Sequence, residues 1–548
     1  MGDMTPAALT RTGIVGRTID AAMRGFRAPA SRPTPGAAYM RNEQMPMFFR
    51  WHPALRDSSD DVKAAWRLAT ARSIDVIQNN GFLAGAIEQS CGSVVGLGLR
   101  LNAKPNAVAL GWTQEQANAW SRHVEMRFSL WTENARACDA GGRFTFGQIL
   151  AQAYRHWMAT GEILATLPWI RKAGTQFGTK IKLLPAWRLS TDSELPDLCS
   201  GVRLDAVGGP RAYRLKFKNG YGGEDQIEVA AEDAYGRPLV VHIFDGEPDQ
   251  VRGISPFTSV LKVTRQFDQL ADATLTTTLI QTIFAAMFKS AAPTEEVLEA
   301  MKSTAEQTDP GIAGMLSAKA DWYKQTDINL GQHGKILHGF PGDELQFFRT
   351  EHPNASYEPF AKFLLRECSR AAAMTYEEFT GDYKGATFTS NKMGTTVIWP
   401  RVLYRRRHIV APLAQRAYEA WLEEDIESGG TPYPGGVPAF LAQREAACQA
   451  FWLGPTKPQA DDEKSAKAAK IKQEIGLPDA VVFEEYGIDP DDAYEQAKRE
   501  QDRREELGLK PRIAAPVAAP GAGAGREEED SADEESEQGD EVSEREEA

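Results

Sequence analysis

The stretch S-P-F-T-S-V-L-K-V-T-R-Q-F-D-Q-L at residues 255–270 opens a long predicted helix. Ser255 is a suitable N-cap, and Pro256 follows at the first helical position, where its fixed φ fits the helix and its missing N–H costs nothing. We expect this helix to span 255–290. It separates a first half of mixed helices and strands from a second half of long helices, so the sequence predicts an α+β fold class.

The residues before this helix alternate between helical and extended patterns. Residues 61–79 and 145–160 carry apolar side chains at helical spacing, and 81–92 continue as a further helical piece. Short apolar runs bounded by turn residues predict strands at 94–101, 162–169, 181–187, 212–218 and 239–244.

The residues after it predict two more long helices, over 357–379 and 391–424. Pro400 and Pro412 must kink or break the second of these, because proline cannot donate the helical hydrogen bond. Two further strands are expected at 335–340 and 344–348, around a P-G-D turn.

The charge of the chain is unevenly placed. The 548 residues have a net charge of −14 and are 42% hydrophobic, which is enough to bury a sizeable core. Residues 526–548 carry 13 acidic and 2 basic residues, a net of −11, which leaves −3 for residues 1–525. The acidity therefore belongs mainly to a tail that is too polar to fold.

Five dispersed cysteines form no C-x-x-C pair, so zinc-ribbon and thioredoxin-type chemistry is not supported, and each is expected to be a small buried residue. The apolar stretch 273–288 is 16 residues long and contains five threonines, too short and too polar for a membrane span. No membrane partner is expected.

The sequence contains neither a complete phosphate-binding loop nor a serine-hydrolase nucleophile motif. Gly334-Lys335 resembles a phosphate-binding loop, but Asn329 and Ile336 stand where that motif needs Gly and Ser or Thr. No G-x-S-x-G elbow is present. We expect a protein that is not an enzyme and uses no cofactor.

Clusters that could hold a metal are also missing from the sequence. His333 and His338 have no acidic partner at ligand spacing, and His352 precedes a proline. Adjacent acids such as Glu377-Glu378 and Glu423-Glu424 point to different sides of a helix, so they are read as solvated surface. No metal site is expected.

Six stretches, in order, resemble the lambda-type family of tailed-bacteriophage portal proteins. They are A-R-S-I-D-V-I-Q-N-N-G-F-L-A-G-A-I at 71–87 with V-V-G-L-G-L-R-L at 94–101; W-M-A-T-G-E-I-L-A at 157–165; V-V-H-I-F at 240–244 with Q-V-R-G-I-S-P at 250–256; F-P-G-D-E-L-Q-F at 340–347 with H-P-N-A-S-Y-E-P-F at 352–360; M-T-Y-E-E-F-T-G-D-Y at 374–383; and F-W-L-G-P-T-K-P at 451–458 with E-I-G-L-P-D at 474–479 and Y-G-I-D-P-D-D at 486–492. The chain departs from the family at 384–391, where K-G-A-T-F-T-S-N replaces an Asn-Tyr-Ser-Ser-x-Arg pattern of which Ser390 and Lys392 preserve part.

The resemblance implies a ring-forming subunit, typically of twelve copies, at one capsid vertex. It implies the following parts: a flexible arm (1–50), an α+β wing (51–254), a first stem helix (255–290), a clip (291–353), a second stem helix (354–379), a tunnel loop (380–390), a long kinked helix with the wing return (391–450), a helical crown-like region (451–510) and a disordered acidic tail (511–548).

The implied partners are other copies of the chain, double-stranded DNA, the terminase large subunit, the major capsid or scaffolding protein, and head-completion or tail-adaptor proteins. The implied location is the virion, with host cytoplasm during assembly. Sliding DNA requires sequence-independent phosphate contact, because base readout would hold it. The residues nearest the tunnel loop that could supply it are Lys384, Thr387, Thr389, Lys392 and Arg401.

The basic run Arg405-Arg406-Arg407 is a weaker candidate. Three consecutive residues fan out over most of a helix, so salt bridges between subunits or a solvated face are favoured over DNA binding. Two alternatives to a portal stay open: a phage DNA-processing enzyme such as a magnesium-dependent nuclease, and a head adaptor that forms no ring.

Overall fold

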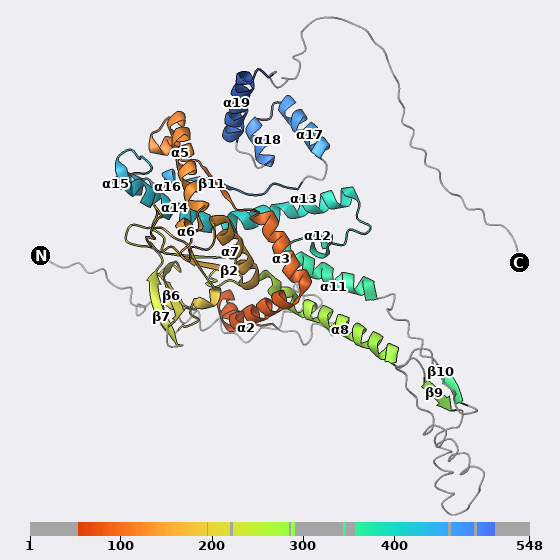
Figure 1. Cartoon of the computed structure of the whole chain (residues 1–548). Coiled ribbons are helices and arrows are strands. Elements are labelled where there is room, and N and C mark those ends of the chain that lie inside the picture. Colours follow the sequence, from red (N-terminus) through yellow and green to blue (C-terminus); the bar gives the residue numbers. More distant parts are fainter. Residues whose placement is uncertain are drawn as a thin grey trace, which may run out of the picture. The chain divides into compact units, whose positions relative to one another are not determined.

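The computed structural model describes residues 53–193, 195–219, 223–283, 287–290, 343–346, 357–458, 462–486 and 490–509. The chain divides into two units, Met1–Pro455 and Thr456–Ala548. The first unit combines helices with several small sheets (Figure 1), which confirms the expected α+β class.

A three-stranded antiparallel sheet lies in the first half, with the order β3-β2-β8. Its strands are β2 (Glu162–Thr166), β3 (Lys182–Leu184) and β8 (Val240–Phe244), each shorter than the predicted run. Helix α7 (Phe146–Thr160) precedes β2 and packs against it, as its apolar face predicts. Gly161, with φ +86°, makes the turn between them and lies against the backbone of Ile254.

A four-stranded sheet follows, with the order β4-β5-β6-β7. Its strands are β4 (Leu198–Cys199), β5 (Val202–Leu204), β6 (Pro210–Lys218) and β7 (Glu224–Ala230). Only β6 was among the predicted strands. The sequence E-D-Q-I-E-V-A of β7 has only two large apolar residues, and most of the strand is exposed. It is extended because its backbone pairs with β6, and burial of its side chains contributes little.

Helices α2 (Ser58–Asn79) and α3 (Gly81–Val94) confirm the two predicted helical pieces. The strand expected at 94–101 is mostly wrong. Val94 ends α3, a turn through Gly96 and Gly98 follows at positive φ, and β1 (Arg100–Ala103) then pairs with β11 (Ala450–Leu453).

Helix α5 (Gln114–Thr132) was not predicted, although Thr113 and Gln116 form a capping box that signals its start. It carries Phe128 and Trp131 into the main core, where the Phe128 ring lies 5.0 Å from Trp421. The remaining short elements are α4 (Ala107–Leu110), α6 (Ala135–Cys138), η1 (Ala186–Arg188), α15 (Gly436–Ala442) and α16 (Arg444–Ala447).

The helix expected over 255–290 is confirmed in its centre and wrong at its ends. Ser255 caps a short 3-10 turn, η2 (Pro256–Val260), and α8 spans Leu261–Ile283. Residues 287–290 are strand β9 (Met287–Ser290), which pairs with β10 (Asp343–Gln346). The strand expected at 335–340 lies outside the described residues.

The helix expected over 357–379 is interrupted. Helix α11 spans Tyr357–Ala372, Ala373 adopts φ +56°, and α12 (Tyr376–Thr380) starts afresh from the capping residue Thr375. Helices α8 and α11 lie side by side (Figure 1).

The helix expected over 391–424 begins earlier and contains one π-helical turn. Helix α13 (Phe388–Arg405) contains Pro400, a π-helical turn η3 occupies Arg406–Val410, and α14 spans Ala411–Glu427. Pro412 stands in the first turn of α14, where it cannot donate a helical hydrogen bond back to residue 408. The irregularity therefore falls where the backbone lacks that donor.

The second unit contains α17 (Asp462–Glu474), α18 (Asp479–Glu485) and α19 (Pro490–Glu506), in agreement with the helical region that the resemblance implies over 451–510. Val482 is buried, and the Tyr486 hydroxyl donates to the Ser465 carbonyl at 3.0 Å. Across both units, the described helices include none with the length and apolarity that a membrane span requires.

All five cysteines are free thiols, and the expected burial is confirmed for four of them. Four of them, Cys91, Cys138, Cys368 and Cys448, are buried, while Cys199 is half-buried.

Candidate nucleic-acid interface

The loop expected at 380–390 joins α12 to α13 and is shorter than predicted. Gly381, with φ +70°, ends α12, and Thr387 caps α13 by accepting a hydrogen bond from the Ser390 N–H at 3.2 Å. The loop is therefore 381–387. Thr389 and Lys392 belong to the first turns of α13 instead.

Three of the five predicted DNA-facing residues are exposed in the loop or on the first turns of α13. Lys384 is exposed in the loop, while Thr389 and Lys392 are exposed three residues apart on one side of α13. The Thr387 side chain is occupied as the helix cap. Phosphate contact by these residues stays a prediction.

Arg401 does not join this group. It follows Lys392 by nine residues, two and a half helical turns, so it projects from the opposite side of α13. There it pairs with Asp245 at 3.6 Å and lies over the Tyr404 ring at 4.7 Å. The Tyr404 hydroxyl donates to the same Asp245 at 3.1 Å. Arg401 therefore holds α13 to the segment after β8.

The expected solvated face at 405–407 is wrong for two of its three arginines, while salt bridges between subunits stay a prediction. Arg405 and Arg406 are buried, and Arg407 is exposed. Arg405 donates to the carbonyl of Ala372 at 2.8 Å, at the end of α11. It also reaches the hydroxyls of Ser90 and Tyr154, both at 3.4 Å.

Arg406 binds three carbonyl oxygens. It donates to Ser93 at 2.9 Å and Val94 at 3.0 Å, which end α3, and to Pro455 at 2.6 Å. Burial lowers the pKa of Arg406 to about 10, because desolvation disfavours the cation. The carbonyl oxygens at the end of α3 offset the cost of burying this cation, since they carry the negative pole of the helix dipole. Together the two arginines fasten the base of α13 to α11 and α3.

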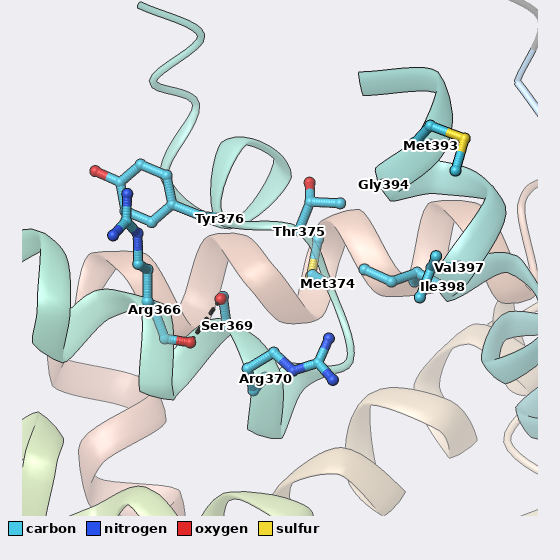
Figure 2. A pocket seen from close by; sticks show the side chains of 10 residues that line it. All are labelled: Arg366, Ser369, Arg370, Met374, Thr375, Tyr376, Met393, Gly394, Val397 and Ile398. Carbon is cyan, nitrogen blue, oxygen red and sulfur yellow. Dashed lines mark hydrogen bonds between the residues drawn. The ribbon is translucent and has the colours of Figure 1, made fainter. Parts of the chain in front are cut away.

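A cavity of about 410 Å³ lies between α11 and α13 (Figure 2). Arg366 and Arg370 form one wall, with the Arg366 guanidinium 5.5 Å from the centre of the Tyr376 ring. Met393 and Val397, 60% and 66% exposed, form the other wall. We call this cavity the α11–α13 groove.

A buried ion network joins stretches that lie far apart in the sequence. The Glu162 carboxylate on β2 has no exposed surface and accepts two hydrogen bonds from one edge of the Arg252 guanidinium, at 2.5 Å from Nη2 and 3.0 Å from Nε. His242 Nε2 lies 2.7 Å from the same carboxylate. The Arg252 guanidinium also lies 4.0 Å from the centre of the Trp66 ring. The sequence signal that could have revealed this network is Glu162, an acidic residue at the start of the largely apolar strand β2.

The electrostatics of Glu162 follow from its partners. Burial by itself raises the pKa of the carboxyl, but Arg252 and His242 more than offset this effect and lower it from 4.5 to about 2. The network thus holds a carboxylate in the core and ties α2, β2, β8 and the chain before η2 together.

The prediction of a solvated face at 423–424 is wrong. The Glu424 carboxylate is buried and accepts from the backbone N–H groups of Gly178 at 2.6 Å and Thr179 at 2.7 Å, and from Trp169 Nε1 at 3.1 Å. Glu423 contacts Arg444. Both acids therefore fix the ends of distant segments against α14.

Among the described residues, no three His, Cys, Asp or Glu side chains come together as a metal site would require. His333, His338 and His352 lie outside the described residues.

Comparison with known proteins shows the family to which the chain is similar. Residues 46–406 match the family model described as "Phage portal protein, lambda family". The "Portal protein" of Escherichia phage N15 is 25% identical over 485 residues, covering 85% of this chain and 90% of the relative. "Portal protein B" of Escherichia phage lambda is 24% identical over 482 residues, with the same coverages.

Two solved structures are also similar. One is the neck of an empty GTA particle computed with C6 symmetry, at a TM-score of 0.39 and 13% identity, covering 80% of this chain and 94% of that chain. The other is the virion of a native gene transfer agent particle, at a TM-score of 0.32 and 16% identity, covering 78% and 99%.

Proposed function

Because the chain belongs to the lambda family of phage portal proteins, we propose that copies of it form a ring, of twelve subunits, around a channel for packaged and ejected DNA. Portal proteins are structural components of the virion at a capsid vertex, and this chain is one of them. The observation that carries the proposal is the family match over residues 46–406, which includes the loop 381–387 and the whole of α13.

Within this ring we assign α8 and α11 to the stem, residues 291–353 to the clip, the loop 381–387 to the channel wall and residues 456–509 to the crown. The wing would be the α+β part before α8. The terminase motor would dock during packaging, and head-completion proteins would replace it afterwards, while capsid or scaffolding protein would surround the wing. A structural role requires no catalytic group of this chain.

DNA contact is proposed for Lys384 and Lys392, with Thr389 beside them. Their side chains are exposed and sit on a loop and a helix start, where they can reach phosphate oxygens of any sequence. Residues 1–525 have a net charge of only −3. A nearly neutral wall suits sliding, because each neutralised phosphate adds affinity that would hold the DNA.

Electron microscopy of the purified full-length protein tests the ring. We expect closed rings with an axial hole and a mass of several hundred kilodaltons, since each copy weighs 60.3 kDa. A monodisperse monomer at micromolar concentration, across a range of salt concentrations, would contradict the proposal, as would rods or small globules.

The double variant Lys384→Ala/Lys392→Ala tests the DNA contact. Assembled rings of this variant should bind duplex DNA more weakly, by the same factor for unrelated sequences, because phosphate contacts are lost. The slope of log affinity against log salt should fall by roughly 0.9 for each phosphate contact removed. Lys63→Ala/Lys218→Ala, which removes two exposed lysines elsewhere, is the matched control. Equal effects of both variants would refute the assignment.

A further inference from the structure

Helix α11 keeps two large aromatic side chains out of the core. Its buried face, which includes Leu364 and Leu365, packs into the main core. Phe360 and Phe363 lie outside that face and are 53% and 62% exposed. Glu367 is exposed four residues beyond Phe363, on the same side of the helix. We call these three residues the aromatic–acidic row.

The α11–α13 groove lies on the neighbouring flank of the same helix. Arg366 and Arg370 are exposed one turn apart and form a basic row beside the aromatic–acidic row. Neither arginine has an ion-pair partner among the described residues, and neither does Glu367. The unpaired charges on the two rows are therefore opposite in sign.

The floor and far wall of the groove are apolar. Met374 is buried at the floor, and the exposed side chains of Met393 and Val397 stand one helical turn apart on α13 (Figure 2). A Cβ on Gly394 would lie 2.8 Å from Thr375 Cγ2, so the glycine lets α13 approach the start of α12 closely. Exposed apolar side chains gathered around a cavity mark an interaction site.

We infer that the aromatic–acidic row of one subunit occupies the α11–α13 groove of the next subunit in the ring. The inference rests on the proposed ring. A ring needs head-to-tail contacts between two different surfaces of the same chain. The groove is lined by residues of α11, the start of α12 and α13, and none of the three residues of the aromatic–acidic row lines it, so groove and row are two different surfaces. Phe360 and Phe363 would fill the apolar groove against Met393, and Glu367 would meet Arg366 and Arg370.

A second copy of the chain suits the groove better than DNA does. Two arginines could bind phosphate, but Met393 and Val397 on the opposite wall offer nothing to a sugar–phosphate backbone. The aromatic–acidic row matches both walls at once, because it carries apolar rings and a carboxylate at helical spacing. Its binding would also hold α13, and with it the loop 381–387, against the neighbouring subunit.

Charge reversal tests the pairing. Glu367→Arg places a third cation against the basic row, and Arg370→Glu places two anions against each other, so each variant alone should lose ring assembly at least tenfold. Mixing the two variants should restore rings. In an alternating ring, Arg at 367 meets Glu at 370 on one side, and Glu367 meets Arg370 on the other. Repair within one subunit cannot explain a rescue that needs two kinds of subunit.

Site-directed cross-linking gives a second measurement. In a Cys199→Ser background, which removes the half-buried thiol, Phe363→Cys/Val397→Cys should give a ladder of covalent multimers with a short bis-maleimide. Met126→Cys/Val397→Cys is the matched control, since Met126 is 56% exposed on α5. The control should give no ladder.

The outcomes separate this inference from the proposed function. If rings form from each single charge variant at the wild-type yield, or if intact rings give no ladder, the inference is overturned while the portal assignment stands. If the wild-type protein forms no ring under any condition, the proposed function fails and the inference fails with it. Loss in the single variants with rescue on mixing supports both.

Discussion

Replacing Arg252 with methionine is expected to lower the free energy of unfolding by about 3–5 kcal/mol, the usual cost of breaking a buried ion pair. The Glu162 carboxylate has no exposed surface and would keep only His242 as a partner. The substitution would also remove hydrogen bonds to the carbonyls of Ala186, Ser190 and Ser200. Chemical denaturation followed by circular dichroism measures the effect.

Arg211→Met is the matched control, because Arg211 is exposed on β6 and the substitution removes the same charge. It should change the unfolding free energy by less than about 0.5 kcal/mol. Equal destabilisation by the two variants would show that the buried network does not stabilise the fold.

The same network predicts a dependence on pH. The folded protein lowers the pKa of Glu162 from 4.5 to about 2, so the unfolded chain takes up this proton first as the pH falls. The contribution of Glu162 is therefore complete above pH 4.5 and is lost between pH 4.5 and about 2. Glu162→Gln should unfold with a shallower pH dependence in that window than the wild type does.

Replacing Arg406 with methionine is expected to lower the free energy of unfolding by about 2–4 kcal/mol, because buried carbonyls would lose their donors. Two of these carbonyls belong to Ser93 and Val94, the last residues of α3. The third belongs to Pro455, the last residue of the larger unit. Amide hydrogen exchange should increase at the end of α3 and across the β1–β11 pair. Chemical denaturation and exchange mass spectrometry measure the two effects.

Arg407→Met provides a close control, since it removes the same charge from the next residue, which is exposed. Its unfolding free energy and exchange pattern should match those of the wild type. If Arg407→Met behaves like Arg406→Met, the charge of the basic run matters and the carbonyl contacts do not.

Much of the order of helices and strands follows from local sequence. Ser255 and Pro256 predict a helix start, because Ser is a favourable N-cap and Pro fits the first helical position. Strand β2 and helix α7 are predicted by the periodicity of their apolar residues. The missing N–H of Pro412 acts locally, so proline placement also predicts the irregular turn before α14, although α13 continues through Pro400. Strand β7 was missed because it has little apolar pattern and exists through its partner β6.

The candidate DNA residues were predicted as a group from their nearness in sequence, and geometry divides them. Lys392 and Arg401 are nine residues apart, a spacing that puts them on opposite sides of α13 once that segment is helical. The ion pair with Asp245 joins residues far apart in the chain, so no local pattern announces it.

The sequence by itself determined the fold class, the family, the helix start at Ser255 and the placement of the acidity in the tail, because each of these depends on composition or on neighbouring residues. The tertiary structure decided which charges are buried. Arg405, Arg406, Glu162 and Glu424 look like surface residues in the sequence. Their partners are carbonyls, N–H groups and side chains from distant segments, and only folding brings those partners within hydrogen-bonding distance.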